Sequence, residues 1–453
     1  MKPPDPRPGQ FALLRQRRFA PFFWTQFLGA FNDNVFKTAL LTIITYDALS
    51  WTTLDPGLLN NLIPGLFILP FVLFSATAGQ LADKLEKSRL ARWVKLLEIA
   101  IMAVAAYGWL AHQLWLLVAA VVGMGLHSTL FGPVKYAYLP QHLRRDELIG
   151  GNGVVEMGTF VGILLGEVLG AVLVVQKSVG PELVAGVTLA MAVLGWLASR
   201  RIPLSPAPVP ELRVGWNPVT ESVRNLGFAM TNRDVFLSMI LNSWFWFFGA
   251  IVLAQFPVYS RVYLDGDHTV FVLLLTVFSL GVGTGSLLCE RLSGRRIEPG
   301  LVPLGAFGLT VFGVDLFFAS LAFAGGGSGA LGAAAIAFGP GGLRVLLDCL
   351  MIGVFGGIYI VPLFAMIQTR CDASRVARTI AGMNILNALF MVTAALLAML
   401  LLGLGFSVPQ IFLVTAMLNA VVTVSVFLMM PEFLQRFVAW IRRYPGAERG
   451  GAG

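Results

Sequence analysis

Charged residues are scarce in this sequence. Asp, Glu, Lys and Arg make up 12% of its 453 residues, and 57% are hydrophobic. A soluble domain contains about 25% charged residues, so the composition excludes an ordinary soluble protein. The mean hydropathy of +0.78 predicts a polytopic membrane protein. Because backbone groups in lipid must pair within the chain, we expect a bundle of membrane-spanning helices.

Cysteines and enzyme motifs are also scarce. The three cysteines Cys289, Cys349 and Cys371 have no CxxC or metal-ligand spacing, so we predict neither a disulfide framework nor a zinc site. The four histidines are dispersed, and the sequence lacks an HxxxxD motif, a Gly-x-Ser-x-Gly elbow and a Walker loop. We therefore expect no enzyme activity, no metal and no cofactor. The basic N-terminus leads directly into an apolar run, so we expect no cleavable signal peptide.

Apolar runs long enough to cross a membrane recur along the chain. The Gly-rich stretch 325–342 is predicted to be a flexible connection. Twelve spans are predicted: 19–46, 57–82, 91–111, 114–140, 148–175, 181–199, 234–262, 269–292, 300–323, 344–368, 375–403 and 408–430.

Basic residues orient these spans. All but six of the 32 Lys and Arg residues fall on one side of a twelve-span arrangement. Lys177 and Arg261 lie in the opposite loops, and four lie in or at the ends of spans: Lys37, Lys95, Lys135 and Arg344. The positive-inside rule then places both termini in the cytoplasm. Topology thus accounts for the net charge of +8, and we expect no nucleic-acid partner.

The Pro-rich central loop divides the chain into two six-helix bundles. Within this loop, residues 216–229 are predicted to form a short surface helix. Near the C-terminus, the segment EFLQRFVAWIRRY is predicted to be an amphipathic helix whose arginines contact membrane lipids. The expected organisation is a tail 1–18, a bundle 19–199, a cytoplasmic linker 200–233, a second bundle 234–430 and an amphipathic segment 431–453.

The two halves resemble each other weakly. GQLADKLEKSR follows the second predicted span, and GSLLCERLSGRR follows the eighth. In the same alignment, Asn152 matches Asn384, and Asn32 matches Asn242. Parallel halves with a site between them are typical of alternating-access carriers.

The first of these motifs resembles the signature of the major facilitator superfamily. This resemblance implies that superfamily's fold, with twelve spans in two pseudo-symmetric bundles. Gly79 would permit a close helix approach, and Asp83 would cap a neighbouring helix or pair with Arg89. These three residues are the predicted conformational latch. The second motif has Cys289 in place of the acid, which predicts a weaker contact there.

Further segments narrow the resemblance. They are TQFLGAFNDN, FGPVKYAYLPQ, NGVVEMGTFVGILLGEVLG, GWNPVTESVRN and IGVFGGIYIVPLFAMIQTR. Together they resemble the bacterial lysophospholipid transporter (LplT) family, and AFNDNVFK resembles its fusions with acyltransferase and acyl carrier protein synthetase domains. The resemblance implies movement of lysophospholipids from the outer to the inner leaflet of the bacterial inner membrane. A cytoplasmic acyltransferase would then restore the diacyl lipid.

Polar residues inside the predicted spans are the candidate substrate site, because charges at membrane depth are costly and usually functional. Asp33 and Lys37 are one helical turn apart and are expected to neutralise each other, with Asn32 beside them. Lys135 follows Gly132-Pro133, where we expect a helix irregularity. Lys135, with Lys37, is predicted to hold the substrate phosphate.

Acidic and amide side chains complete the predicted site. Glu156 and Glu167 lie within about 20° of one helical face, and Asn152 is one turn before Glu156. Asp33 or Glu156 is predicted to meet a substrate amine. The second half offers Asn242, Asn384 and Asn387. Arg344 and Asp348 are expected to pair locally, which leaves Asp315 alone.

Two other functions fit the same residues. The intramembrane carboxylates would also suit a proton-coupled multidrug exporter of the same superfamily, which predicts dependence on the proton gradient. A membrane anchor for an acyltransferase would instead tolerate replacement of Asp33 or Lys135.

Overall fold

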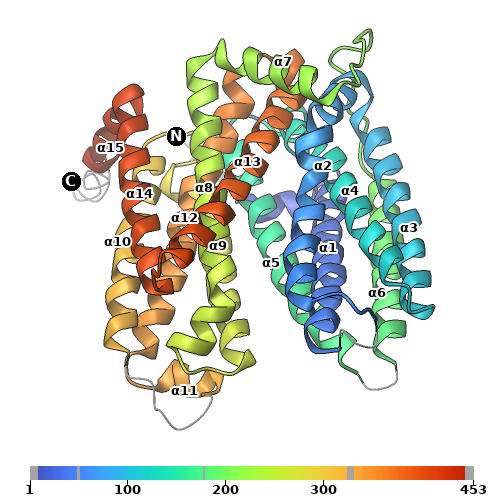
Figure 1. Cartoon of the computed structure of the whole chain (residues 1–453). Coiled ribbons are helices and arrows are strands. Elements are labelled where there is room, and N and C mark those ends of the chain that lie inside the picture. The colour runs from blue at the N-terminus through green and yellow to red at the C-terminus, as the bar shows by residue number, and fades with distance from the viewer. Residues whose placement is uncertain (1–8, 48–50, 177–178, 324–330, 444–453) are drawn as a thin grey trace. The chain divides into compact units, whose positions relative to one another are not determined.

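The computed structural model describes residues 9–47, 51–176, 179–323 and 331–443 (Figure 1). In these ranges the chain is helical, and the only β-structure is an isolated bridge between Gly266 and Leu331. The α-helices are α1 (Ala20–Asp47), α2 (Pro56–Lys84), α3 (Lys87–Leu110), α4 (Leu114–His142), α5 (Leu148–Val174), α6 (Gly180–Ser199), α7 (Pro218–Met230), α8 (Arg233–Val258), α9 (His268–Leu292), α10 (Leu301–Ala322), α11 (Ala333–Phe338), α12 (Gly342–Arg370), α13 (Val376–Gly403), α14 (Val408–Met429) and α15 (Glu432–Arg443).

Each of the twelve predicted spans corresponds to one long helix. Eleven of these helices, within the described ranges, are long and apolar enough to cross a membrane. The helix outside that group is α1, which has 28 residues. Its polar residues Asn32, Asp33, Asn34 and Lys37 lower its hydropathy, so α1 has the length of a span without the usual composition.

Short polar side chains define several helix starts. Asp55 accepts a hydrogen bond from the backbone N–H of Leu58 at the start of α2. Glu86 accepts from the N–H groups of Ser88 and Arg89 at the start of α3. Ser407 and Gln410 form a reciprocal capping box at the start of α14. These caps satisfy N–H groups that the first helical turn leaves without partners, so they explain where the spans begin.

The described helices form two compact units. The first contains residues 1–144, 158–232 and 371–388, and the second contains 145–157, 233–370 and 389–453. The first ten residues of α5 therefore cluster with the second unit, and the first turns of α13 cluster with the first. The expected division into bundles 19–199 and 234–430 stays a prediction.

In the first unit, α1 packs against α6, α2 and α4. Two glycines of α5 also bring it very close to α1. A Cβ atom at Gly166 would lie 2.4 Å from the carbonyl oxygen of Phe31, and one at Gly170 would lie 2.4 Å from that of Val35. Any larger residue would push α1 away, so these glycines fix the position of the helix that carries Asp33 and Lys37.

In the second unit, α12 packs against α9, α10 and α8. Its core includes Trp244 and Phe247 of α8, which pack with Leu401 and Ile411.

The shorter predicted elements have mixed outcomes. Helix α7 confirms the predicted helix at 216–229, and α15 confirms the helical C-terminal segment. The expectation of a structureless connection at 325–342 is wrong in part, because α11 forms at Ala333–Phe338. Residues 324–330 of that stretch lie outside the described ranges.

Candidate substrate site

A buried polar cluster joins α1, α3 and α4 in the first unit. The carboxylate of Glu98 accepts hydrogen bonds from Lys95 Nζ at 2.6 Å and from Asn32 Nδ2 at 2.8 Å. His127 Nε2 lies 3.3 Å from the same carboxylate. The Lys95 and Glu98 side chains are fully buried. Because a buried charge is stable only when it is paired and hydrogen-bonded, these contacts explain how α3 can carry two charges.

Lys95 depends on space provided by α1. A Cβ atom at Gly29 would lie 2.6 Å from Lys95 Nζ. The ammonium group also lies 5.5 Å from the ring centre of Phe131. A side chain at Gly29 would therefore displace the ammonium from Glu98.

This cluster is not among the sites predicted from the sequence. Lys95 lies within a predicted span and His127 is one of four dispersed histidines, and no prediction involves Glu98. The available signal was the i,i+3 spacing of a base and an acid inside the apolar run 91–111. No spacing rule connects that pair with His127, because the contact depends on how α3 packs against α4.

Asp33 and Lys37 have different partners. Asp33 Oδ2 accepts a hydrogen bond of 2.7 Å from Ser128 Oγ of α4. Lys37 Nζ lies 4.4 Å from the ring centre of Phe67 of α2. The direct ion pair predicted from their i,i+4 spacing is therefore absent from the described part of the chain. Asp33 and Lys37 thus lie one turn apart on α1, and each contacts an uncharged side chain of another helix.

Lys135 lies in a chain of polar groups that links α4, α5 and α1. Its ammonium group donates a hydrogen bond of 2.7 Å to Thr159 Oγ1. The Thr159 hydroxyl donates in turn to Gln26 Oε1 at 3.1 Å. The cation on α4 is thus connected to α1 through hydroxyl and amide groups.

Helix α4 continues from Leu114 to His142 and contains Pro133, which cannot donate a backbone hydrogen bond to the preceding turn. The preceding glycine has another role. A Cβ atom at Gly132 would lie 2.7 Å from Nδ2 of Asn384, which belongs to the first turns of α13. Gly132 thereby allows a candidate amide to approach α4 within the first unit. The other candidate on α13, Asn387, is half-buried.

The predicted residues of α5 are divided between the two units. Asn152 belongs to the second unit and forms a reciprocal amide pair with Gln368 of α12, with N···O distances of 2.7 and 3.1 Å. Glu156 is buried in the same unit, with 1% of its surface exposed. Glu167 is half-buried and belongs to the first unit. The structure therefore associates Asn152 with α12 and places the two glutamates in different units.

Asn242 is fully buried on α8 in the second unit. Neither its amide nitrogen nor its amide oxygen has a hydrogen-bond partner among the described residues. Since a buried polar group without a partner is costly, this side chain has an unmet bonding requirement.

Asp83, one of the three predicted latch residues, contacts a different base from the one expected. Asp83 accepts hydrogen bonds from the backbone N–H groups of Ala377 and Arg378 at 3.3 and 3.4 Å, so it caps the start of α13. It also pairs with the Arg378 guanidinium rather than with Arg89, at an Nε–Oδ2 distance of 2.8 Å. The Arg89 guanidinium instead lies 4.7 Å from the ring centre of Trp93. Asp83 was expected either to cap a neighbouring helix or to pair with Arg89, and the structure shows the helix cap.

Gly79 permits this approach, because a Cβ atom there would lie 2.5 Å from the Cβ of Ala381. At the corresponding position of the second-half motif, Cys289 is buried and its Sγ donates to the carbonyl oxygen of Gly285 at 3.4 Å. This position therefore carries no charge.

Arg344 also has an unexpected partner. Its Nε donates to Oδ2 of Asp315 of α10 at 3.1 Å. The expectations of a local pair with Asp348 and of a solitary Asp315 are therefore wrong. The contact joins α12 to α10, whose packing was not predictable from residue spacing.

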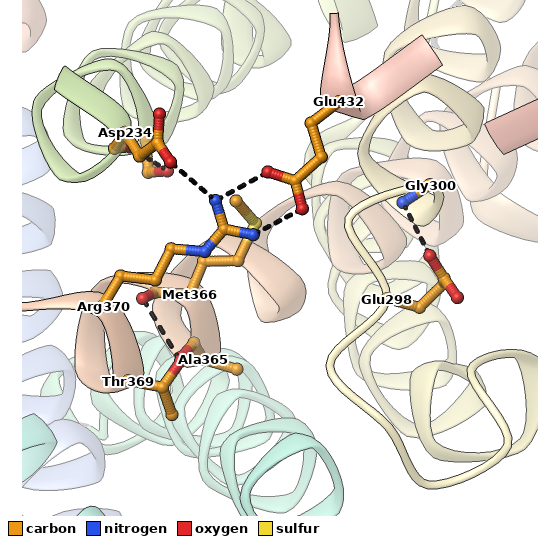
Figure 2. A network of polar contacts seen from close by, with 9 residues as sticks. Asp234, Glu298, Gly300, Ala365, Met366, Thr369, Arg370 and Glu432 are labelled. Carbon is orange, nitrogen blue, oxygen red and sulfur yellow. Dashed lines mark hydrogen bonds and ion pairs between the residues drawn. The ribbon is translucent and has the colours of Figure 1, made fainter. Parts of the chain in front are cut away.

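A second ionic network lies at the end of α12 (Figure 2). The Arg370 guanidinium donates to both carboxylate oxygens of Glu432, at 2.7 and 2.8 Å, and to Asp234 at 3.2 Å. These contacts join the end of α12 to the starts of α15 and α8. The Arg370 hydrogen bond lowers the pKa of Glu432 below its usual value of 4.5. Glu432 is therefore stabilised in its ionised form.

The apolar residues of α15 complete its attachment. Phe433 is fully buried, and Trp440 Nε1 donates to the carbonyl oxygen of Leu292 at 2.7 Å. A Cβ atom at Gly300 would lie 2.8 Å from backbone atoms of Arg436 and Phe437. The amphipathic helix is thus docked on the second unit along its length.

This arrangement of long apolar helices with buried charges and an Asp-capped helix contact defines a membrane carrier. The chain belongs to the Major Facilitator Superfamily, because residues 22–343 match the sequence pattern of that family. It is a multi-pass membrane protein.

The chain is similar to curated proteins named lysophospholipid transporter LplT. The one from Serratia proteamaculans is 26% identical over 365 residues, which cover 79% of this chain and 81% of that protein. The one from Klebsiella pneumoniae is 27% identical over 354 residues, which cover 76% and 78%. The solved fucose:proton symporter FucP of E. coli has a TM-score of 0.66 and 13% identity, with 90% of this chain and 97% of that chain covered. That structural likeness shows the fold alone.

Proposed function

We propose that this protein is a lysophospholipid transporter that moves its substrate from the outer to the inner leaflet of the bacterial inner membrane. The similarity to LplT proteins over about four-fifths of the chain carries this proposal. It favours a lysophospholipid substrate over the drugs of a proton-coupled exporter. A cytoplasmic acyltransferase that consumes the product is the expected partner.

The first unit supplies groups suited to a lipid phosphate. Lys37 Nζ rests against the face of Phe67, and Lys135 Nζ is held by a neutral hydroxyl. A phosphate attracts the Lys37 cation more strongly than this aromatic ring does, and its oxygens would accept a hydrogen bond from Lys135. Asp33, one turn from Lys37, would meet the substrate amine, with Glu156 as the other candidate. Glu167, Asn32, Asn152, Asn384 and Asn387 remain candidates for further contacts.

The topology belongs to the same proposal. Helix α1 would also cross the membrane and bring the number of spans to twelve, with its polar residues turned to the substrate and its charges sheltered by α4 and α2. Both termini and the linker would lie in the cytoplasm, and the bundles 19–199 and 234–430 would alternate access to the site. The Asp83–Arg378 contact would then act at the cytoplasmic end of α2.

Uptake of labelled lysophosphatidylethanolamine into spheroplasts tests the proposal, with and without a protonophore. The intact chain should import the lipid, and Asp33→Asn and Lys135→Met should each reduce uptake at least tenfold at equal expression. Arg344→Met, which removes a cation from an exposed pair, is the matched control and should retain uptake. Absence of uptake by the intact chain would overturn the assignment. Ethidium efflux that collapses with the protonophore would establish the exporter instead.

A further inference from the structure

One face of α8 carries polar atoms that the rest of the second unit does not use. Asn242 and Trp246 are one helical turn apart and therefore share a face. The amide nitrogen and oxygen of Asn242 and the indole Nε1 of Trp246 are all buried, and none has a hydrogen-bond partner among the described residues. This face thus presents two donor groups and one acceptor that form no hydrogen bond with the described part of the chain.

The neighbouring faces of α8 are already occupied. The carbonyl oxygen of Leu241 accepts a hydrogen bond from the Tyr359 hydroxyl of α12 at 3.1 Å. Trp244 Nε1 donates to Asn419 Oδ1 of α14 at 2.9 Å. The hydrogen bonds that join α8 to α12 and α14 therefore come from Leu241 and Trp244. They do not involve the side chains of Asn242 and Trp246.

There is room along the same face. Gly249 follows Asn242 by seven residues and Trp246 by three, so it continues the face. A Cβ atom at Gly249 would have no neighbouring atom within 4 Å. Such a face, with polar atoms at one level and open space beyond, suits an amphiphile.

We infer that this face binds the glycerol region of a monoacyl glycerophospholipid, an inference that rests on the proposed function. The amide oxygen of Asn242 accepts from the free sn-2 hydroxyl, and its nitrogen donates to the same oxygen. Trp246 Nε1 donates to the neighbouring sn-1 ester carbonyl, and the acyl chain passes Gly249. A diacyl lipid has no hydroxyl at sn-2 and would leave the buried Asn242 oxygen without a donor. The subsite therefore selects lyso lipids over diacyl lipids.

The test compares two ligands on the purified full chain. Binding of lysophosphatidylethanolamine is measured beside its 2-deoxy analogue, which differs only in the missing hydroxyl. The wild-type protein should prefer the hydroxylated lipid by roughly tenfold. Asn242→Leu, of similar volume, should bind both lipids equally. Trp246→Phe, which removes the N–H donor together with part of the ring system, should weaken the binding of both lipids several-fold and keep the preference. Trp216→Phe, at a position 74% exposed, is the control and should change neither.

Thermal unfolding without lipid provides a second readout. If Asn242 serves the ligand rather than the fold, Asn242→Leu should be at least as stable as the wild type, because no protein hydrogen bond is lost. An undiminished preference in Asn242→Leu, or equal binding of the two lipids by the wild type, would overturn the inference alone. Failure of the wild type to bind either lipid would instead overturn the proposed function.

Discussion

Arg378 and Asp83 are 295 positions apart, yet the guanidinium Nε of one lies 2.8 Å from the carboxylate of the other. The Asp83 side chain is fully buried, and that of Arg378 is 15% exposed. The same carboxylate caps the first turn of α13, so a single acidic side chain supports both an ion pair and a helix start.

Replacing Asp83 by Asn tests the importance of this contact. The amide keeps an oxygen for the backbone N–H groups but loses the charge, so Arg378 is left without its counter-ion. We expect a loss of roughly 3 kcal/mol in stability, since breaking a largely buried ion pair from one side costs at least that much. Thermal unfolding in detergent measures it, with the exposed Glu211→Gln as control. Unchanged stability would contradict this prediction and would show that solvent stabilises the unpaired Arg378 charge as well as Asp83 does.

The Lys95–Glu98 pair predicts strong coupling between two substitutions. Glu98→Gln should destabilise the protein by about 3–5 kcal/mol, because it leaves the buried Lys95 without its counter-ion. Lys95→Met should cost less, because Glu98 keeps its contacts with Asn32 and His127. The double variant should lose much less than the sum of the two. Unfolding temperatures of all four proteins, measured under one condition, give the coupling. Additive losses would contradict the pairing.

Lys37 should affect transport more than stability. Its ammonium group rests on the Phe67 ring, so Lys37→Met breaks no ion pair within the described chain. We expect more than a tenfold loss of lysophospholipid uptake with a nearly unchanged unfolding temperature. Lys37→Arg should retain part of the uptake, because it keeps the charge and the contact with the ring. Equal loss of stability and uptake would instead indicate a structural role.

Docking of α15 should weaken in acid. Because Arg370 lowers the pKa of Glu432 below 4.5, this contribution to stability is complete above about pH 4.5 and is lost as the pH falls through the lowered pKa. Hydrogen exchange of residues 432–443 should therefore accelerate under acidic conditions. Glu432→Gln should show fast exchange already at pH 7 and little further change in acid. Identical pH profiles in both proteins would contradict the role of this ion pair.

Helix positions were predictable from sequence because they depend on local patterns. Apolar runs of about 20 residues and capping residues such as Asp55 mark the spans within a few residues. Partners of charged residues were not predictable in the same way. Asp33 and Lys37 have ideal spacing for a pair, but contacts with Ser128 and Phe67 on other helices take precedence.

Contacts between helices could be predicted from the sequence only where they involve a residue of a known motif. Asp83 was expected to cap a neighbouring helix because GQLADKLEKSR resembles a known signature, although its basic partner was misassigned. No motif covers the Glu98 cluster, since its members come from three helices and meet only after packing. The unmet bonding of Asn242 likewise depends on what surrounds it, which residue type alone does not reveal.

The attachment of α15 has a consequence for biogenesis. Its contacts come from the ends or beginnings of α12, α8 and α9, all of which precede it in the chain. Since synthesis proceeds from the N-terminus, this helix emerges after its acceptors and docks only when those earlier segments have met. A correctly seated Trp440 therefore reports that the ends of α9 and α12 and the start of α8 have reached their folded positions.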